Sequence, residues 1–171
     1  MPSRRLAAAE VFEDPLVREL LDARVVCVLA TFDDEHIHAV PMWFAREGSE
    51  VYLATGSRSR KVRNIGRDAR ATLVVHDSRP GFEVCGVSIA GRAEAVTGEE
   101  ASALVDVVHR RYVDAGAEHD DSVREFLESD DVAIRFRPES ALTWDERGSA
   151  GSEALRETGG ALPLLPTEPR P

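Results

Sequence analysis

The only lysine of the chain, Lys61, lies in its most basic segment, residues 57–70. This segment contains six basic residues and a single acid, Asp68, whereas the whole chain has a formal net charge of -10. In an acidic protein, one basic turn concentrates positive potential where a small anion can bind. Lysine is a compact point charge and arginine a planar fork, so the two are not equivalent at a phosphate. The segment indicates either an anion site or a solvated helix face that carries one lysine by chance.

The residues just before this segment strengthen the first interpretation. Gly56 lets the backbone approach an anion, Thr55 and Ser57 offer hydroxyl groups, and the start of the following helix offers unpaired N–H groups. Arg60 and Lys61 then add positive charge. The pattern has neither a Walker nor a Rossmann glycine fingerprint. It predicts a phosphate site at the junction of a strand and a helix.

Pro41, Met42 and Trp43 form a second candidate group. A flat heteroaromatic ring needs an apolar wall and backbone edges for its polar atoms, and a strand interrupted by proline beside a tryptophan can offer both. Proline cannot donate to a strand ladder, so the strand has an edge, a bulge or a ligand at this point. The alternative is that Trp43 is a core residue at the rim of a barrel.

Hydrophobic periodicity predicts the elements that position these residues. Helices are expected at 14–23, 59–68, 97 to about 116, and 121–128. Asp14-Pro15 opens the first of these helices, and residues 97–100 form a capping box at the start of the third. Strands are expected at 24–31, 38–45, 50–55, 71–76, 82–96 with bends at Gly86 and Gly91, and 132–136 continuing past Pro138. Short connections and glycine bends favour a mainly β fold with peripheral helices, a six- to seven-stranded antiparallel barrel.

Composition limits the class of protein further. Residues 1–147 are expected to form one domain, and residues 148–171, with four of the nine prolines and four glycines, a mobile tail. The sequence has no apolar run long enough for a transmembrane helix and no secretory signal. Cys27 and Cys85 are expected as buried thiols in a reducing cytoplasm. The net charge argues against nonspecific binding to nucleic acid or to an anionic membrane.

Four stretches resemble a known family: VPMWF, LATGSRSRKVRNIGRDARATLVV, VSIAGRAEAVT and FRPESALTWD. They are similar to the pyridoxamine 5'-phosphate oxidase-like split β-barrel proteins, and most similar to the flavin/deazaflavin oxidoreductases of actinobacteria. The resemblance covers roughly residues 14–146 and is most specific at KVRNIGRDAR, which resembles K-x-R-N-L-x-R-D-P-R. Ala69 stands where that pattern has proline.

The resemblance implies a homodimer with two cofactor sites at the subunit interface. The cofactor phosphate would lie near Thr55, Ser57, Arg60 and Lys61, the ring would lie along Pro41, Met42 and Trp43, and the partner chain would close the site. The resemblance implies the following cofactor-binding residues: Pro41, Met42, Trp43, Thr55, Gly56, Ser57, Arg60, Lys61, Asn64 and, as the partner's contribution, Val87, Ser88 and Trp144.

The implied chemistry is hydride transfer between the bound cofactor and a small organic substrate. The cofactor supplies the reactive atom, so no catalytic side chain is expected. F420 is favoured over FMN because Arg58, Arg60, Arg63, Arg67 and Arg70 can meet its acidic tail. The alternative is a non-catalytic cofactor or heme-binding protein on the same barrel, with His38 or His76 as axial ligand. A metal site at His36 and His38 is set aside, because histidines at a hairpin are more often solvated. His109 is expected on the outer face of its helix.

Overall fold

The computed structural model describes residues 3–79 and 83–158. Its strands are β1 (Arg4–Ala7), β2 (Cys27–Asp33), β3 (His36–Met42), β4 (Phe44–Glu47), β5 (Glu50–Gly56), β6 (Arg70–Arg79), β7 (Glu83–Val96) and β8 (Asp131–Asp145). Its helices are α1 (Ala8–Val11), α2 (Pro15–Asp22), α3 (Arg60–Arg67), α4 (Glu99–Tyr112), the 3-10 turn η1 (Ala117–His119), α5 (Asp121–Leu127) and α6 (Ala150–Thr158). Within the described residues, no helix is both long and apolar enough to span a membrane.

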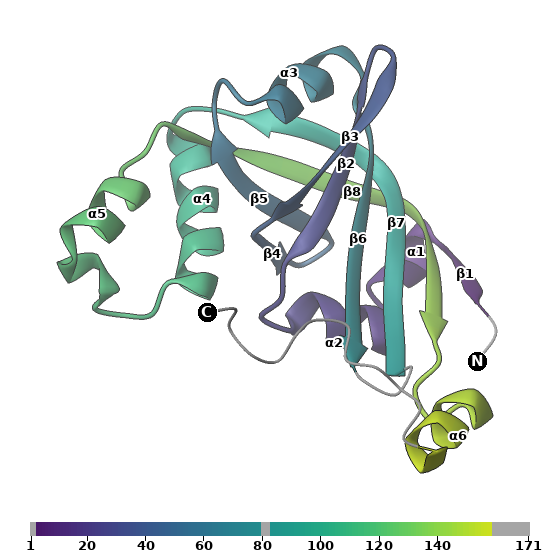
Figure 1. Cartoon of the computed structure of the whole chain (residues 1–171). Helices are drawn as coiled ribbons and strands as arrows, with labels where there is room; N and C mark the ends of the chain where they lie inside the picture. The colour runs from purple at the N-terminus through teal and green to yellow at the C-terminus, as the bar shows by residue number, and fades with distance from the viewer. Residues whose placement is uncertain (1–2, 80–82, 159–171) are drawn as a thin grey trace.

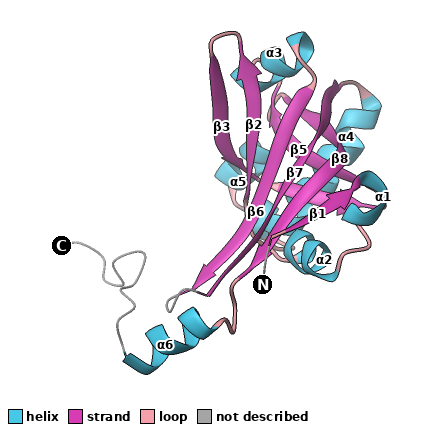
Figure 2. Ribbon diagram, turned by 90° about the vertical axis from the view of Figure 1, so that its right-hand side faces the viewer, coloured by secondary structure: helices cyan, strands magenta, loops and turns pink. Residues whose placement is uncertain are grey.

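All eight strands belong to one antiparallel sheet (Figures 1 and 2). Its order is β3-β2-β6-β7-β8-β5-β4, and β1 pairs with β8 beside this path. The two ends of the order, β3 and β4, are consecutive in the chain and separated only by Trp43. The chain therefore passes from one end of the sheet to the other at Trp43, which is how the sheet curls around its core. The expected antiparallel split barrel is confirmed.

The strand count is eight rather than six or seven, for two reasons. The N-terminal β1 was not predicted; it pairs Leu6 with Ala141 of β8, and Leu6 is buried. The predicted strand 38–45 is two strands, because the chain leaves β3 after Met42 and starts β4 at Phe44. Pro41 lies within β3, at the edge of the sheet, as its missing N–H required.

The main core fills the inside of the curled sheet. Its largest fully buried side chains on the strands are Leu29, Phe44, Leu53, Leu73, Ile89, Ile134 and Phe136. Helix α2 packs Val17 and Leu21 into this core. Asp14 caps α2 as expected, accepting hydrogen bonds from the backbone N–H groups of Leu16 and Val17 at 3.0 and 3.1 Å.

The two glycines expected to bend β7 have different roles. At Gly91 the register with β8 shifts, and a Cβ there would lie 2.2 Å from the carbonyl oxygen of Arg137, so only glycine allows this close approach. At Gly86 the register is regular. There a Cβ would lie 2.2 Å from the ring of Trp144, so the indole packs on the bare backbone. Gly91 is the bend and Gly86 is a packing site.

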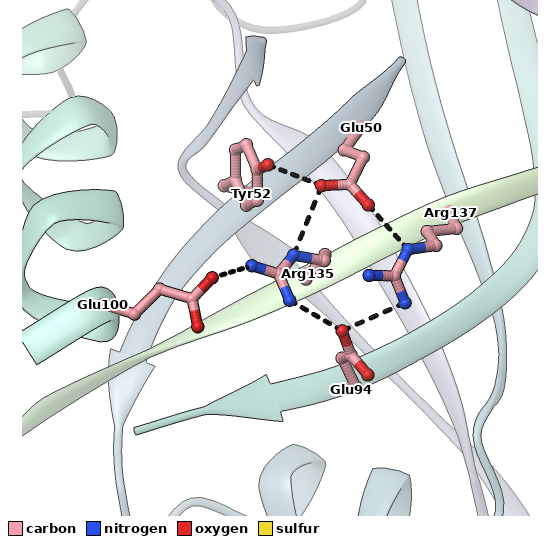
Figure 3. A network of polar contacts seen from close by, with 6 residues as sticks. All are labelled: Glu50, Tyr52, Glu94, Glu100, Arg135 and Arg137. Atoms are coloured by element: carbon pink, nitrogen blue, oxygen red, sulfur yellow. Dashed lines mark hydrogen bonds and ion pairs between the residues drawn. The ribbon is translucent and has the colours of Figure 1, made fainter. Parts of the chain in front are cut away.

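A network of polar side chains ties β5, β7, β8 and α4 together (Figure 3). Arg135 on β8 is its centre; it lies 2.8 Å from Glu94 on β7, 3.3 Å from Glu50 on β5, and also pairs with Glu100 in the first turn of α4. Arg137 bridges the same two strand carboxylates at 2.6 and 3.0 Å. The network therefore fixes the N-terminal end of α4 against the sheet.

Two helical regions differ from expectation. The capping box at Thr97 is wrong: α4 has Gly98 as its N-cap, with φ of 76° and no side-chain cap, because the turn out of β7 falls one residue later. The helix ends at Tyr112 rather than near Gly116. In the expected tail, α6 forms at Ala150–Thr158, and residues 159–171 lie outside the described residues. A separate tail beginning at residue 148 stays a prediction.

Candidate functional site

The junction between β5 and α3 folds as the sequence indicates. β5 ends at Gly56, and Ser59 is the N-cap of α3. Lys61 turns back to the strand, and its Nζ donates a 2.8 Å hydrogen bond to Thr55 Oγ1. Burial lowers the pKa of the Lys61 ammonium below its ordinary 10.5, and Asp131 acts in the opposite direction. The structure therefore holds a partly desolvated positive charge at the end of the strand, where an anion interacts with it more strongly than in water.

The arginines of this segment differ in what they contact. Arg60 Nε lies 3.3 Å from Asp33 Oδ2, and Arg67 lies 3.5 Å from the other oxygen of the same carboxylate. Among residues 3–79 and 83–158, no ion pair includes Arg58 or Arg63. Positive charge that is not neutralised by a carboxylate is thus concentrated at Arg58, Lys61 and Arg63.

A cavity of about 330 Å³ lies beside this junction, and we call it the Trp43 cavity. Its lining residues come from the β3–β4 junction, the end of β5, the start of β8, α4 and α5. They are Pro41, Met42, Trp43, Ala54, Thr55, Gly56, His109, Phe126 and Asp131. The fold therefore brings the proline–tryptophan group and the strand end into one cavity, although they lie on different strands.

The hydroxyl groups of the junction are arranged differently from expectation. Ser57 Oγ donates to Asp130 Oδ2 at 2.5 Å, and the Ser57 N–H donates to the Asp130 carbonyl at 2.9 Å, so Ser57 anchors the chain to the start of β8. Ser59 was not predicted as a site residue, yet its Oγ is buried and has no hydrogen-bond partner among the described residues. Buried hydroxyl groups normally have a partner, so Ser59 is the better candidate to bind a ligand.

Asn64, the remaining site residue predicted on α3, is fully buried. Its Nδ2 donates to Thr31 Oγ1 on β2 at 3.1 Å, and its Oδ1 accepts from Arg67 Nη2 at 3.1 Å. Both ends of the amide are engaged in holding α3 on the sheet, and Asn64 does not line the Trp43 cavity. These two hydrogen bonds account for an asparagine at this position, and a ligand contact is not needed to explain it.

The three residues assigned to a partner chain lie away from the Trp43 cavity. Val87 is fully buried in the core, so its side chain cannot reach a partner; the alternation along β7 turns Ser88 outward instead. Ser88 lines a separate cavity of about 390 Å³ with Arg5 and Leu142. Trp144 covers Gly86, as described above. A role of Ser88 and Trp144 at a partner's site stays a prediction, and Val87 could contribute only through its backbone.

Four residues of the Trp43 cavity were not anticipated: Ala54, His109, Phe126 and Asp131. His109 was expected on the outer face of its helix but is only 4% exposed. Its Nε2 lies 3.5 Å from Asp131 Oδ2. The helical spacing contained the signal, because His109 follows Val105 by four residues and precedes Tyr112 by three, and both of these face inward.

Aromatic rings form one wall of the cavity. Trp43 stacks on Tyr112 with ring centres 4.8 Å apart and planes 5° from parallel. Phe126 meets Trp43 edge to face at 5.6 Å and lies 5.2 Å from the His109 ring. Phe126 is 45% exposed and joins α5 to this wall. Trp43 is therefore neither a plain core residue nor a solvent-exposed one. It forms part of the cavity wall, and Tyr112 covers one face of its indole ring.

Other reactive groups give no competing site in the described part of the chain. Cys27 is buried, and burial raises the pKa of its thiol to about 12, so it stays protonated. Burial also raises the pKa of Cys85. No group of three or more histidine, cysteine or carboxylate side chains is placed to hold a metal ion there.

Comparisons with known proteins agree with this geometry. Among the solved structures that share the fold is a conserved hypothetical protein from Mycobacterium tuberculosis, with 23% identity, coverage of 90% of each chain and a TM-score of 0.65. An F420 reductase has 21% identity, covers 72% of this chain and 94% of its own, and has a TM-score of 0.55. A heme storage protein from Vibrio cholerae has 17% identity, covers 79% of this chain and 96% of its own, and has a TM-score of 0.60. At these identities they show the fold alone. A search of curated proteins gave no match. The model of the pyridoxamine 5'-phosphate oxidase family matches residues 14–145, which include strands β2 to β8 and all residues that line the Trp43 cavity. The chain therefore belongs to the pyridoxamine 5'-phosphate oxidase family.

Proposed function

We propose that this protein is an oxidoreductase that binds a phosphate-bearing flavin or deazaflavin and transfers a hydride between it and a small organic substrate. The observation that carries the proposal is the Lys61–Thr55 contact at the edge of the Trp43 cavity. It joins the one partly desolvated lysine to a cavity with an aromatic wall. A ligand with an anionic group and a flat ring matches both halves of this arrangement.

The residues present fit such a cofactor. The Ser59 hydroxyl is buried without a partner, and Lys61 points toward the strand end rather than into solvent. These two groups would hold the phosphate, together with the first N–H groups of α3, whereas Arg60 is already paired with Asp33. Pro41, Met42 and Trp43 would support the ring.

The protein's part in the reaction is to bind, orient and exclude water. When bound, the cofactor supplies a carbon or nitrogen that carries the hydride. Trp43 is held in place by its stacking on Tyr112, so the wall is formed before a ligand arrives. A preformed wall lowers the entropy cost of binding.

We favour F420 over FMN as the cofactor. Arg58 and Arg63 are exposed or half-exposed and, within the described residues, form no ion pair. Their charges are available to an acidic tail longer than a single phosphate. FMN, which ends at its phosphate, would leave these two arginines without a ligand group.

A homodimer would complete the site. The outward face of the sheet exposes Phe32, Ile37 and Leu142, with exposed fractions of 42%, 68% and 39%. Phe32 and Ile37 pair across β2 and β3, so they form one apolar surface. A second copy covering this face would remove it from water and bring Ser88 and Trp144 toward the partner's cofactor.

Non-catalytic binding of a cofactor or tetrapyrrole is the second candidate function. Neither His38 nor His76, the axial ligands expected from the sequence, lines the Trp43 cavity. His109 does line it, and this buried histidine at the cavity is the observation that supports the second candidate.

The test is a set of three titrations of the apo protein with FMN, F420 and hemin, followed by fluorescence and absorption. Quenching by F420 at the lowest concentration supports the proposal as stated. Quenching by FMN alone would keep the site and change the cofactor. A Soret band that forms while neither flavin binds would replace the oxidoreductase with the second candidate.

A further inference from the structure

His109 separates two cavities. On one side is the Trp43 cavity; on the other is a larger cavity of about 490 Å³ between α4 and the η1–α5 segment, which we call the outer cavity. The lining of the outer cavity includes charged side chains, such as Asp106 and Arg110, and apolar ones, such as Val113 and Leu127. His109 lines both cavities, so one ionisable ring borders the candidate ligand site and a second cavity beside it.

Asp131 faces one nitrogen of this ring. Its Oδ2 lies 3.5 Å from His109 Nε2, and its side chain is only 13% exposed. Because Asp131 is the first residue of β8 and His109 is on α4, the contact joins two elements that the network around Arg135 also fixes. A carboxylate that faces one ring nitrogen favours the tautomer with its proton on that nitrogen, and orients the ring for proton transfer at the other.

A purely structural role explains the position of His109 poorly. The neighbouring inward positions of α4 are apolar, and a histidine at a buried position has to be partnered by a polar group. Leucine would fill the same space without that requirement. The histidine and its carboxylate instead face the cavity that contains the predicted ring-binding residues.

We propose that His109 is the proton donor and acceptor of the site, and that Asp131 is its positioning residue. This inference rests on the proposed hydride transfer. A bound reduced flavin or deazaflavin would supply a hydride to an electrophilic carbon of the substrate, and the electron pair of the substrate's double bond would move to its other end. His109 would donate a proton to that atom and regain one from solvent through the outer cavity. In the reverse direction His109 removes the same proton.

The first test observes the histidine rings directly, by nitrogen–proton correlation spectra of protein labelled at histidine. FMN and F420 are added in turn while binding is followed by fluorescence quenching. The His109 signal is assigned by its loss in His109→Gln. If that variant does not fold, the signal is assigned by elimination from variants of the four other histidines. We expect the His109 signal to move on binding and the His119 signal, in η1, to stay.

The second test measures proton transfer. The protein-bound reduced cofactor is mixed without oxygen with a water-soluble quinone, which must gain a hydride and a proton to become a hydroquinone. His109→Ala should slow this single turnover by about 10²-fold or more, as expected for loss of a general acid, and imidazole in solution should restore part of the rate. His119→Gln is the matched control and should react as the wild type does. Asp131→Asn should slow the reaction while His109 still responds to cofactor.

The outcomes separate the two proposals. If neither cofactor quenches fluorescence, the proposed function fails, and the role of His109 fails with it. If a cofactor binds but the His109 signal does not move, or if His109→Ala reacts at the wild-type rate, the role of His109 alone is overturned.

Discussion

Lys61 donates a hydrogen bond of 2.8 Å to Thr55, a residue six positions earlier at the end of the preceding strand. The contact turns the only lysine of the chain back toward the Trp43 cavity, away from the solvent that surrounds Arg58 and Arg63. Burial lowers the pKa of the ammonium, so its charge is destabilised in the absence of a ligand. An anion placed beside it would relieve that cost, and this relationship is the basis of the proposed site.

Ser59 and Ser57 offer a matched pair of substitutions. Ser59→Ala removes a buried hydroxyl that has no partner, so the free energy of unfolding should stay the same or rise slightly, while cofactor binding weakens by about 1–3 kcal/mol. Ser57→Ala removes the hydrogen bond to Asp130 and should lower stability instead. Urea unfolding and a cofactor titration on each variant check both results. A Ser59 variant that is less stable but binds normally would show that this hydroxyl belongs to the fold.

Alanine substitutions at Gly91 and Gly66 test whether a close backbone approach at Gly91 accounts for the bend in β7. Gly91→Ala would place a Cβ 2.2 Å from the Arg137 carbonyl oxygen and should lower the free energy of unfolding by about 1–3 kcal/mol, the usual cost of overpacking. Gly66 lies within α3, and a Cβ added there would meet no neighbouring side chain within 4 Å, so Gly66→Ala should stabilise the protein by about 0.5–1 kcal/mol. Thermal unfolding compares the two. Equal effects would contradict the close approach at Gly91.

The network around Arg135 makes a prediction about acid stability. Burial raises the pKa of Glu50, but hydrogen bonds from Tyr52 and Arg137 lower it more, so the net pKa is below the ordinary 4.5. The hydrogen bond from Arg135 likewise lowers the pKa of Glu94. A carboxyl whose pKa is lowered in the folded state stabilises the fold above its ordinary pKa, and this contribution is lost as the pH falls through the folded value.

Arg135→Met should therefore flatten the pH dependence of unfolding below 4.5, in addition to lowering stability at neutral pH. Urea unfolding at pH values above and below 4.5 measures this. Arg18→Met, which removes an exposed pair with Glu13, is the control and should keep the wild-type slope. A wild-type slope in Arg135→Met would mean that these carboxylates are not stabilised by Arg135.

Much of the fold followed from local patterns in the sequence. The run from Glu50 to Gly56 and the helical spacing of Val62, Ile65 and Ala69 placed β5 and α3 within one or two residues. Asp14 and Pro15 opened α2 as expected. These features depend on residues close in the sequence, where strand propensity and capping decide the outcome.

The features that the sequence did not reveal depend on distant contacts. Nothing local to Trp43 signals that the strand breaks there, because the break follows from closure of the sheet between β3 and β4. The polarity of His109 favours the outer face of α4, but its spacing of four residues from Val105 places it on the inner face, where it is buried. Ser59 was passed over in favour of Ser57, since only the fold shows that Asp130 already engages Ser57.

The most direct test of the central claim is the affinity of Lys61→Ala for whichever of F420 and FMN binds the wild type, measured by calorimetry. Arg18→Ala, an exposed arginine paired with Glu13 away from the site, is the matched control. Loss of a charged hydrogen bond predicts that Lys61→Ala binds about 1–3 kcal/mol more weakly, roughly 5- to 150-fold, while Arg18→Ala binds as the wild type does. Equal affinity in Lys61→Ala and the wild type would contradict the account, because the lone lysine would then have no part in holding the cofactor.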